Sequence, residues 1–446
     1  MRTPCLLFAD PALSILRGCE LRIKRARRGA LAFVPESIVL GRSVVAQRLA
    51  LRPNCRIFTN QPSTMQRLFA QRAGNMARVT GKVEMVKEAF ARSAVVLLLL
   101  MLALACIVAD SGLLATLGVW LAWMVLAVAI DAVSPRVGRT RDAAGSTTTA
   151  LLFAAPLLQG AVLVYALWLV SAAPEGPMSI AMIAVVVGIS GGTVGISAAH
   201  ELVHRRGSLE RGIAQAFMLL VSYPHFPIVH LRVHHPYVGT PLDPGTSRLN
   251  EPLVHFVGRA FVLAWHSGWR VERSRLARKG LTPWRIDNAI LRALTLQAAL
   301  YVAVGTAFGW IGLALFGGQS AVAILLALTI DYTQHYGVVR RETASGRLER
   351  LRADHAWTSD HASNRSTFNL GLHADHHMKP MQGYSQLVND DGALQAPMGY
   401  PGLLLLALVP PLWYRVMNTR LSANSRADAY ATANLTGAPV APKRGC

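Results

Sequence analysis

The sequence has little of the chemistry that builds disulfide frameworks or cysteine-ligated metal sites. Five of its 446 residues are cysteines, and no two of them form a Cys-x-x-Cys pair: Cys5, Cys19, Cys55, Cys106 and Cys446. This spacing argues against a disulfide scaffold and against a cysteine zinc site. Any electron-transfer cluster that serves this protein must therefore belong to another protein.

Acidic residues are also scarce, with 24 Asp and Glu against 45 Lys and Arg, and the net charge is +21. A net charge this positive could indicate binding to nucleic acid, but the distribution of the basic residues argues against it. Residues 1–80 hold 14 of the Lys and Arg residues and only three acidic ones. Most of the remainder lies in loops between apolar segments, where anionic lipid and acidic proteins are the natural counterparts. We therefore expect no nucleic-acid partner.

Residues 1–90 show no sustained helical period and no histidine. This basic N-terminal extension is interpreted either as an Arg-rich targeting segment or as the product of a start codon placed too early. We assign no function to it.

Long apolar runs dominate the rest of the chain, which is 52% hydrophobic with a mean hydropathy of +0.34. Six runs reach membrane-spanning length, about 20 residues: 93–110, 113–133, 149–172, 179–199, 293–315 and 320–334. No Lys or Arg lies between Arg141 and His200 or between Arg292 and Arg340. If both termini are cytoplasmic, all Lys and Arg residues fall on the cytoplasmic side, as the positive-inside rule requires. This holds for six spans but not for five or seven. The predicted fold is an all-α membrane protein of about six transmembrane helices.

Histidine is missing from the first 199 residues, although the chain contains 14. The first histidines form the motif His200-Glu201-Leu202-Val203-His204, whose two imidazoles share a helix face and can bind one ion. His230 and His234 repeat this spacing, and His235 points about 100° away from its neighbour, toward a possible second ion.

A third group of histidines follows the last apolar run. His373, His376 and His377 occupy positions i, i+3 and i+4, so a helix would let all three face one point. Nine imidazoles are too many for one ion and suit two, and imidazole binds iron readily. The predicted ligands are His200, His204, His230, His234, His235, His335, His373, His376 and His377.

The motif that begins at His200 is also the signature of zinc proteases, in which the glutamate acts as a base. Asp243 could then supply an acidic third ligand. A zinc site needs only three protein ligands, however, so this alternative leaves the other two histidine motifs unexplained.

Four strings carry a resemblance to membrane alkane hydroxylases, which belong to the fatty-acid-desaturase-like superfamily: HELVHRR, HLRVHHPYVGTPLDPGTS, QHYGVVRR and GRLERLRADHAWTSDHASNRSTFNLGLHADHH. The similarity covers roughly residues 93–420. It implies a bacterial inner-membrane protein with two non-haem irons that hydroxylates the terminal carbon of n-alkanes with O2. It also implies rubredoxin as electron donor, reduced in turn by an NAD(P)H-dependent rubredoxin reductase. The expected layout is a basic extension over 1–90, a membrane di-iron hydroxylase domain over 91–420 and a tail over 421–446.

Some positions depart from the alkane hydroxylase pattern. Asp331 and Gln334 stand where that family usually has Asn and Glu, and Leu242 replaces an acidic residue. Gln334 and the string Thr-Pro-Leu-Asp at 240–243 are closer to xylene monooxygenase hydroxylase subunits, which oxidise aromatic methyl groups. A fatty-acyl desaturase of the same superfamily is a further alternative.

Two sets of residues are expected around the ligands. Histidine ligands need acceptors that fix their orientation, and the candidates by position in the sequence are Glu201, Asp243, Asp331 and Asp375. Trp123 lies eight residues before Asp131, roughly 12 Å deeper along a helix. We expect its indole either to form the floor of a hydrocarbon pocket or to fill the core.

Overall fold

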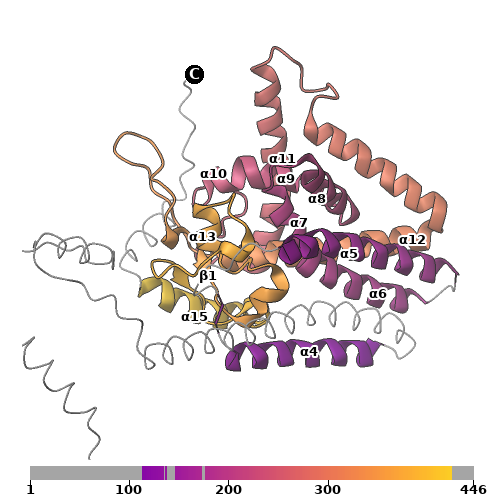
Figure 1. Cartoon of the computed structure of the whole chain (residues 1–446), viewed down its shortest axis with the longest axis horizontal. Helices are drawn as coiled ribbons and strands as arrows, with labels where there is room; N and C mark the ends of the chain where they lie inside the picture. Colours follow the sequence, from indigo (N-terminus) through magenta and orange to yellow (C-terminus); the bar gives the residue numbers. More distant parts are fainter. Residues whose placement is uncertain (1–112, 135, 138–145, 173–175, 424–446) are drawn as a thin grey trace, which may run out of the picture. The chain divides into compact units, whose positions relative to one another are not determined.

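The computed structural model describes residues 113–134, 136–137, 146–172 and 176–423 (Figure 1). The predicted first span (93–110), the basic extension (1–90) and most of the predicted tail (421–446) lie outside the described residues. Among the described residues, three helices are long and apolar enough to cross a membrane. In the part described, the chain is mostly helical, as predicted, with two parallel two-residue strands, β1 (Trp357–Thr358) and β2 (Leu394–Gln395).

Long apolar helices follow the predicted spans closely in the first half of the described chain. They are α4 (Leu113–Val133), α5 (Ser146–Ala172), and α6 (Pro177–Ser190), which continues through the π-helical turn η2 (Gly191–Gly195) into α7 (Ile196–Val203). Thr149–Ala172 and Pro177–Val203 are long and apolar enough to cross a membrane. The predicted spans 149–172 and 179–199 therefore correspond to real helices.

The second predicted pair of spans is misplaced. We expected a turn at Gly317–Gln319, but residues Ala289–His335 form α12, whose two helical arms meet at Gly309 (Figure 1). Gly309 has φ of +66°, a conformation that glycine adopts without strain. Gln319 stays helical and donates from its side chain to the carbonyl of Leu220, 2.8 Å away. The arms are thus 289–308 and 310–335.

Glycines allow the helices before and after the histidines to pack tightly. A Cβ at Gly188 would lie 2.6 Å from the carbonyl oxygen of Gln319, and one at Gly192 would lie 2.9 Å from Cα of Ala323. Both distances are shorter than ordinary contact. Only glycine therefore lets α6 and η2 lie this close to the second arm of α12, as expected for small residues between membrane helices.

Apart from α11, the polar half of the chain is built from shorter elements. The segment after α7 contains α8 (Ser208–Leu220), α9 (Phe226–Val229), the π-helical turn η3 (His230–His234), α10 (His235–Tyr237) and α11 (Leu253–Ala277). The segment after α12 contains η4 (Ala353–His355), η5 (Ala362–Thr367), α13 (His373–Met378), η6 (Tyr384–Gln386), α14 (Tyr400–Ala407) and α15 (Pro410–Ser422). Trp413, Met417 and Leu421 anchor α15 in the core.

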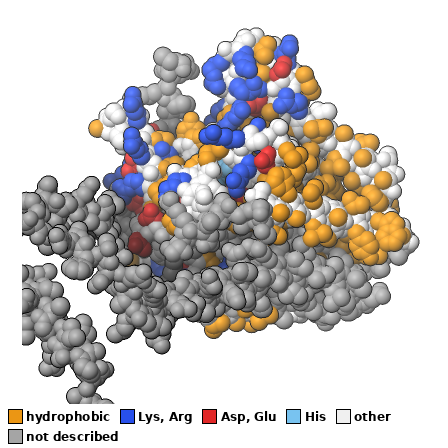
Figure 2. All heavy atoms as spheres, viewed as in Figure 1, with side chains coloured by type: hydrophobic (Ala, Val, Ile, Leu, Met, Phe, Trp, Pro, Cys, Tyr) orange, Lys and Arg blue, Asp and Glu red, His pale blue; other side chains and the backbone are white. Residues whose placement is uncertain are grey.

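Hydrophobic side chains are exposed along the long helices. Leu157, Val164 and Trp168 of α5 are between 55% and 60% exposed, and Trp310 of α12 is 71% exposed. Figure 2 shows hydrophobic atoms gathered over the part that α5, α6 and α12 occupy. Exposed apolar surface of this kind is covered by lipid or by another protein. Together with the spanning lengths, it identifies a membrane protein.

Candidate metal centre

The nine predicted histidines come together as two buried groups. In each group, one nitrogen from every ring lies within 4.8 Å of the others. The first group contains five histidines: His200, His204, His230, His235 and His376. The second group contains four: His234, His335, His373 and His377. We call them the five-histidine group and the four-histidine group.

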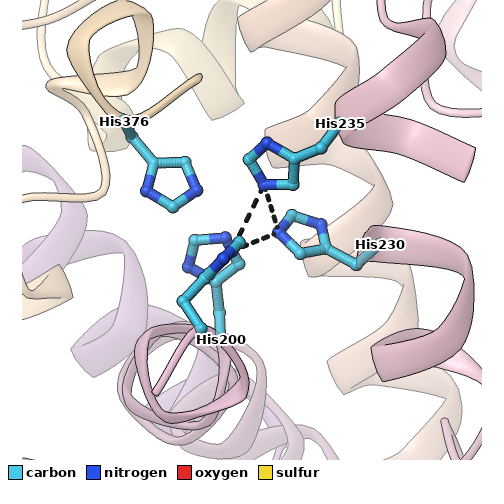
Figure 3. Close-up of side chains that lie close together, drawn as sticks. His200, His230, His235 and His376 are labelled. Atoms are coloured by element: carbon cyan, nitrogen blue, oxygen red, sulfur yellow. Dashed lines mark hydrogen bonds between the residues drawn. The ribbon is translucent and has the colours of Figure 1, made fainter. Parts of the chain in front are cut away.

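The five-histidine group points its ring nitrogens at one another (Figure 3). The Nε2 atoms of His204 and His230 lie 2.9 Å apart, and Nε2 of His235 lies 3.2 Å and 3.0 Å from them. Two nitrogens bound at right angles to one ion, each about 2.1 Å from it, would lie about 3.0 Å apart. The triangle therefore has the dimensions of a metal site.

Unpartnered nitrogens in the same place support a metal. Nε2 of His200 and Nε2 of His376 are buried and have no hydrogen-bond partner among the described residues. A buried polar atom without a partner costs free energy unless something binds it. The donor set is all nitrogen and numbers five, which exceeds the four ligands of a tetrahedral zinc site.

The four-histidine group shows the same close approach and has an additional support. The Nε2 atom of His373 lies 3.0 Å from that of His335 and 2.9 Å from that of His377. Nδ1 of His234 donates to the Asp243 carboxylate over 2.9 Å, which leaves its buried Nε2 without a partner. This bond fixes the ring orientation and the tautomer that leaves Nε2 free for a metal.

Asp243 is itself held by the loop that follows α10. Its carboxylate accepts hydrogen bonds from the Thr246 hydroxyl at 2.7 Å and from the Gly245 amide at 3.0 Å. Thr246 was not among the residues predicted from the sequence. Its position three residues after a predicted partner of a ligand was the available signal, since such a spacing favours a local side-chain bond.

The division of the second motif differs from our expectation. His230 belongs to the five-histidine group and His234 to the four-histidine group, although four-residue spacing predicted a shared ion. The reason is η3, where a π-helical turn widens the helix so that residues five apart share a face. His230 therefore joins His235. Pro236 lacks the N–H that an α-helix would donate to the carbonyl of Arg232, which favours the wider turn.

The three histidine side chains of the third motif also do not face one point. His373 and His377 belong to the four-histidine group, whereas His376 belongs to the five-histidine group. On α13, the consecutive residues His376 and His377 point about 100° apart around the helix axis. The five-histidine group lies on the side of His376, and the four-histidine group lies on the side of His377. Since α13 and the segment η3–α10 each serve both groups, the groups are neighbours. The rings of His235 and His377 are 4.6 Å apart.

Burial keeps most of these imidazoles uncharged. Burial and the charge of His234 and Arg205 lower the pKa of His204 to about 4. Burial and neighbouring histidines also hold the pKa well below its usual range for five others: His230, His235, His373, His376 and His377. Burial alone would lower the pKa of His234, but the Asp243 carboxylate outweighs it and raises that pKa. Neutral imidazoles present the lone pairs that metals bind.

The four predicted outer carboxylates lie in different places. Asp243 contacts a histidine of the four-histidine group. Glu201 accepts hydrogen bonds from Arg205 at 2.7 Å and from the Tyr384 amide at 3.1 Å. It therefore joins α7 to η6 and forms no hydrogen bond with a histidine among the described residues.

Asp375 forms an ion pair with the Lys379 side chain at 2.5 Å and accepts a hydrogen bond from the Val388 amide at 3.1 Å, which fixes α13. Asp331 lines a cavity of about 30 Å³ beside His230 and His234. Trp123 lies in α4, but its side chain is outside the described residues, and its role stays a prediction.

The protease alternative requires a different arrangement. His200 and His204 do share a group, but Asp243, its proposed third ligand, bonds to His234 of the other group. The carboxylate of Glu201, the proposed base, instead accepts hydrogen bonds from the Arg205 side chain and the Tyr384 amide. The geometry favours two metal sites of nitrogen ligands.

Known proteins are similar to this chain over about half of its length. Alkane 1-monooxygenase 1 of Pseudomonas aeruginosa is 38% identical over 233 residues, which are 52% of this chain and 61% of that protein. Alkane 1-monooxygenase of Ectopseudomonas oleovorans is 34% identical over 58% of this chain and 65% of its own length. The xylene/toluene monooxygenase hydroxylase component of Pseudomonas putida is 29% identical over 49% and 58%. The matches thus span less than two thirds of these relatives.

A match to a family profile covers more than half of the chain. The profile described as fatty acid desaturase matches residues 176–416, which include all nine histidines of the two groups. On this match, the chain belongs to the fatty acid desaturase family.

Proposed function

We propose that this protein is an integral-membrane, non-haem di-iron monooxygenase that hydroxylates the terminal carbon of n-alkanes with O2. The observation that carries the proposal is the pair of adjacent buried groups of five and four histidines. The similarity to alkane 1-monooxygenases over about half of the chain supports the substrate class.

Two iron ions held by the five-histidine and four-histidine groups would supply the electron-transfer and dioxygen chemistry that side chains lack. The overall reaction inserts one oxygen atom into a C–H bond and releases the other as water, and it consumes two electrons and two protons. Because the chain has no cysteine pair for a cluster of its own, the electrons come from a separate carrier. We assign that role to rubredoxin, reduced by an NAD(P)H-dependent rubredoxin reductase.

The protein's own residues hold the metal ligands in position, admit the substrate and exclude water from the site. Asp243 holds the imidazole of His234, while Glu201 and Asp375 fix the helices that carry the other ligands. The apolar helices α5, α6 and α12 admit a hydrocarbon directly from the bilayer, so the substrate never crosses water. All nine histidines are buried, which keeps bulk water from the reacting carbon.

The Lys and Arg distribution supports a bacterial inner-membrane location with both termini and the histidine groups on the cytoplasmic side. In that orientation, a soluble electron carrier can reach the metal centre. The exposed arginines near it would attract an acidic carrier, and added salt would weaken this attraction.

A second candidate substrate is an aromatic methyl group. The side chain of Gln334 donates to the Tyr400 hydroxyl and to the Leu370 carbonyl close to His335, where alkane hydroxylases usually have glutamate. The similarity to the xylene/toluene hydroxylase component also favours this candidate.

Metal content and product analysis on one preparation test the proposal. Protein from iron-replete cells should carry close to two irons per chain and, with rubredoxin and its reductase, should convert octane or hexadecane to the 1-alcohol. Conversion of xylene alone would favour the aromatic candidate, and an alkene product would indicate a desaturase. Stoichiometric zinc without iron would overturn the proposal.

A further inference from the structure

A basic pocket lies on the outer side of the helix that carries three of the ligand histidines. It has a volume of about 300 Å³ and forms where η3, the end of α11 and the start of α12 meet. Its charged lining consists of four cations and two carboxylates: Arg232, Arg275, Lys279, Arg292, Glu272 and Asp287. The net charge of the lining is therefore +2.

A buried carboxylate builds the floor of this pocket. Glu272 is fully buried and accepts hydrogen bonds from Arg232 at 2.8 Å, from Arg275 at 2.8 Å and from the Ala289 amide at 2.9 Å. These bonds join η3, α11 and α12 and give the pocket a fixed shape. Arg275 also donates to the Asp287 carbonyl at 2.6 Å.

Two cations at the rim are available to a ligand. Lys279 is exposed, and neither it nor Arg292 forms an ion pair with any carboxylate that the structure describes. Arg292 donates to the Ile286 carbonyl at 3.3 Å. Asp287, a carboxylate of the pocket lining, already forms an ion pair with Arg285 at 3.0 Å.

The pocket lies at the level where a membrane helix begins. The spanning segment of α12 starts at Ala289, in the pocket wall, and Arg292 lies in its first turn. Trp284 and Ile286, just before it, are 74% and 65% exposed. Figure 2 shows Lys and Arg side chains crowded over the end of α11 beside this segment. Exposed Trp among basic residues at a helix start is typical of the lipid headgroup level.

We propose that this pocket binds the phosphate-bearing headgroup of an anionic membrane lipid. Basic pockets beside cytoplasmic helix ends suit such headgroups, because two or more cations can contact one phosphate. A soluble acidic protein is less suitable, since the exposed Trp284 and Ile286 adjoin the rim and would face water in its absence. The lipid would contact Arg232, which stands between His230 and His234, so the headgroup would brace the helix of the metal centre.

Native mass spectrometry of the detergent-purified full chain tests this proposal. The probes are phosphatidylglycerol and phosphatidylcholine with matched acyl chains, and inorganic phosphate. The pocket variant is Lys279→Gln with Arg292→Gln, and Lys279→Gln alone is a milder exposed change. The matched control is Arg273→Gln with Arg278→Gln, which removes two exposed charges from the same region outside the pocket lining.

The wild type and the control should retain one phosphatidylglycerol in preference to phosphatidylcholine, and the pocket variant should retain about tenfold less. Lys279→Gln alone should fall between them. Equal losses in both double variants, or equal retention of the two lipids, would overturn the proposal. Displacement of the lipid by millimolar inorganic phosphate would assign the pocket to free phosphate. Full lipid retention with lost binding of an acidic electron carrier would make it a protein-docking surface instead.

Discussion

The two histidine groups are neighbours, but they are supported differently. In the four-histidine group, His234 rests on a carboxylate that is itself bonded to Thr246 and Gly245. Within the described residues, no histidine of the five-histidine group donates to a carboxylate; its rings are held by the helices that carry them. One ligand of the four-histidine group is therefore fixed from outside by a hydrogen bond, and among the described residues no ligand of the five-histidine group is fixed in this way. If both hold iron, their ions have unequal surroundings.

The largest effect is expected from removing a ligand of either group. His234→Ala and His376→Ala should each abolish alkane hydroxylation and lower bound iron from about two to about one per chain. Iron analysis and product assays on membranes with equal protein levels check this. The control is His255→Ala, whose side chain is 62% exposed and pairs with Glu251. Unchanged iron content in both ligand variants would refute the assignment of these histidines.

The comparison itself is tested by removing the charge behind His234. Asp243→Asn should lower activity about 10- to 100-fold, because the acceptor of the ligand's N–H bond is weakened. Iron loss should be partial, since the five-histidine group is intact. The exposed Asp391→Asn serves as a control. Wild-type activity in Asp243→Asn would mean that the two groups are not supported differently.

A smaller effect is expected from Thr246, which is one hydrogen bond farther from the ligand His234 than Asp243 is. Thr246→Val keeps the side-chain shape but removes the hydroxyl, which donates to Asp243 at 2.7 Å and accepts from the Gly239 amide at 2.9 Å. Of these two bonds, the one to Asp243 supports the ligand His234, and its loss costs about 1 kcal/mol, which corresponds to a loss of activity of roughly five-fold. Rates at saturating octane measure it. A loss as large as that of Asp243→Asn would show that Thr246 acts by more than this bond.

The smallest change in total activity is expected far from both groups. Trp123→Ser removes bulk from α4 without adding charge, so iron content should be unchanged. If the indole is the pocket floor, rates on long alkanes should rise relative to rates on octane. Parallel chain-length profiles for the variant and the wild type would instead make Trp123 a packing residue.

That these nine histidines come together was predictable from the sequence, but their division into two groups was not. Eight of them were identified because imidazoles at helical spacing recur three times within one half of the chain, and His335 was identified from its position at the end of the last apolar run. The separation of His230 from His234 was not predicted, because a four-residue spacing places two side chains on one face only in an α-helix. A π-helical turn changes which residues share a face, and no simple sequence spacing reports it.

The long helices were also predicted better than their bends. Apolar runs identified α5, α6 and α12, since spanning length depends mainly on composition. The break in α12 was expected at Gly317–Gln319, where glycines cluster, but it occurs at Gly309. The cluster instead serves close packing: a Cβ at Gly318 would lie 3.0 Å from that of Ala184. Glycine marks both functions, and only the tertiary contacts distinguish them.

His234 and His235 are consecutive residues, and their rings belong to different groups. A single planar peptide unit, with Cα atoms about 3.8 Å apart, thus links the two sites covalently. Because this link cannot stretch, the two sites cannot move apart at His234 and His235 during turnover. This link also makes the motif intolerant of length variation. One inserted or deleted residue here would exchange ligands between the sites.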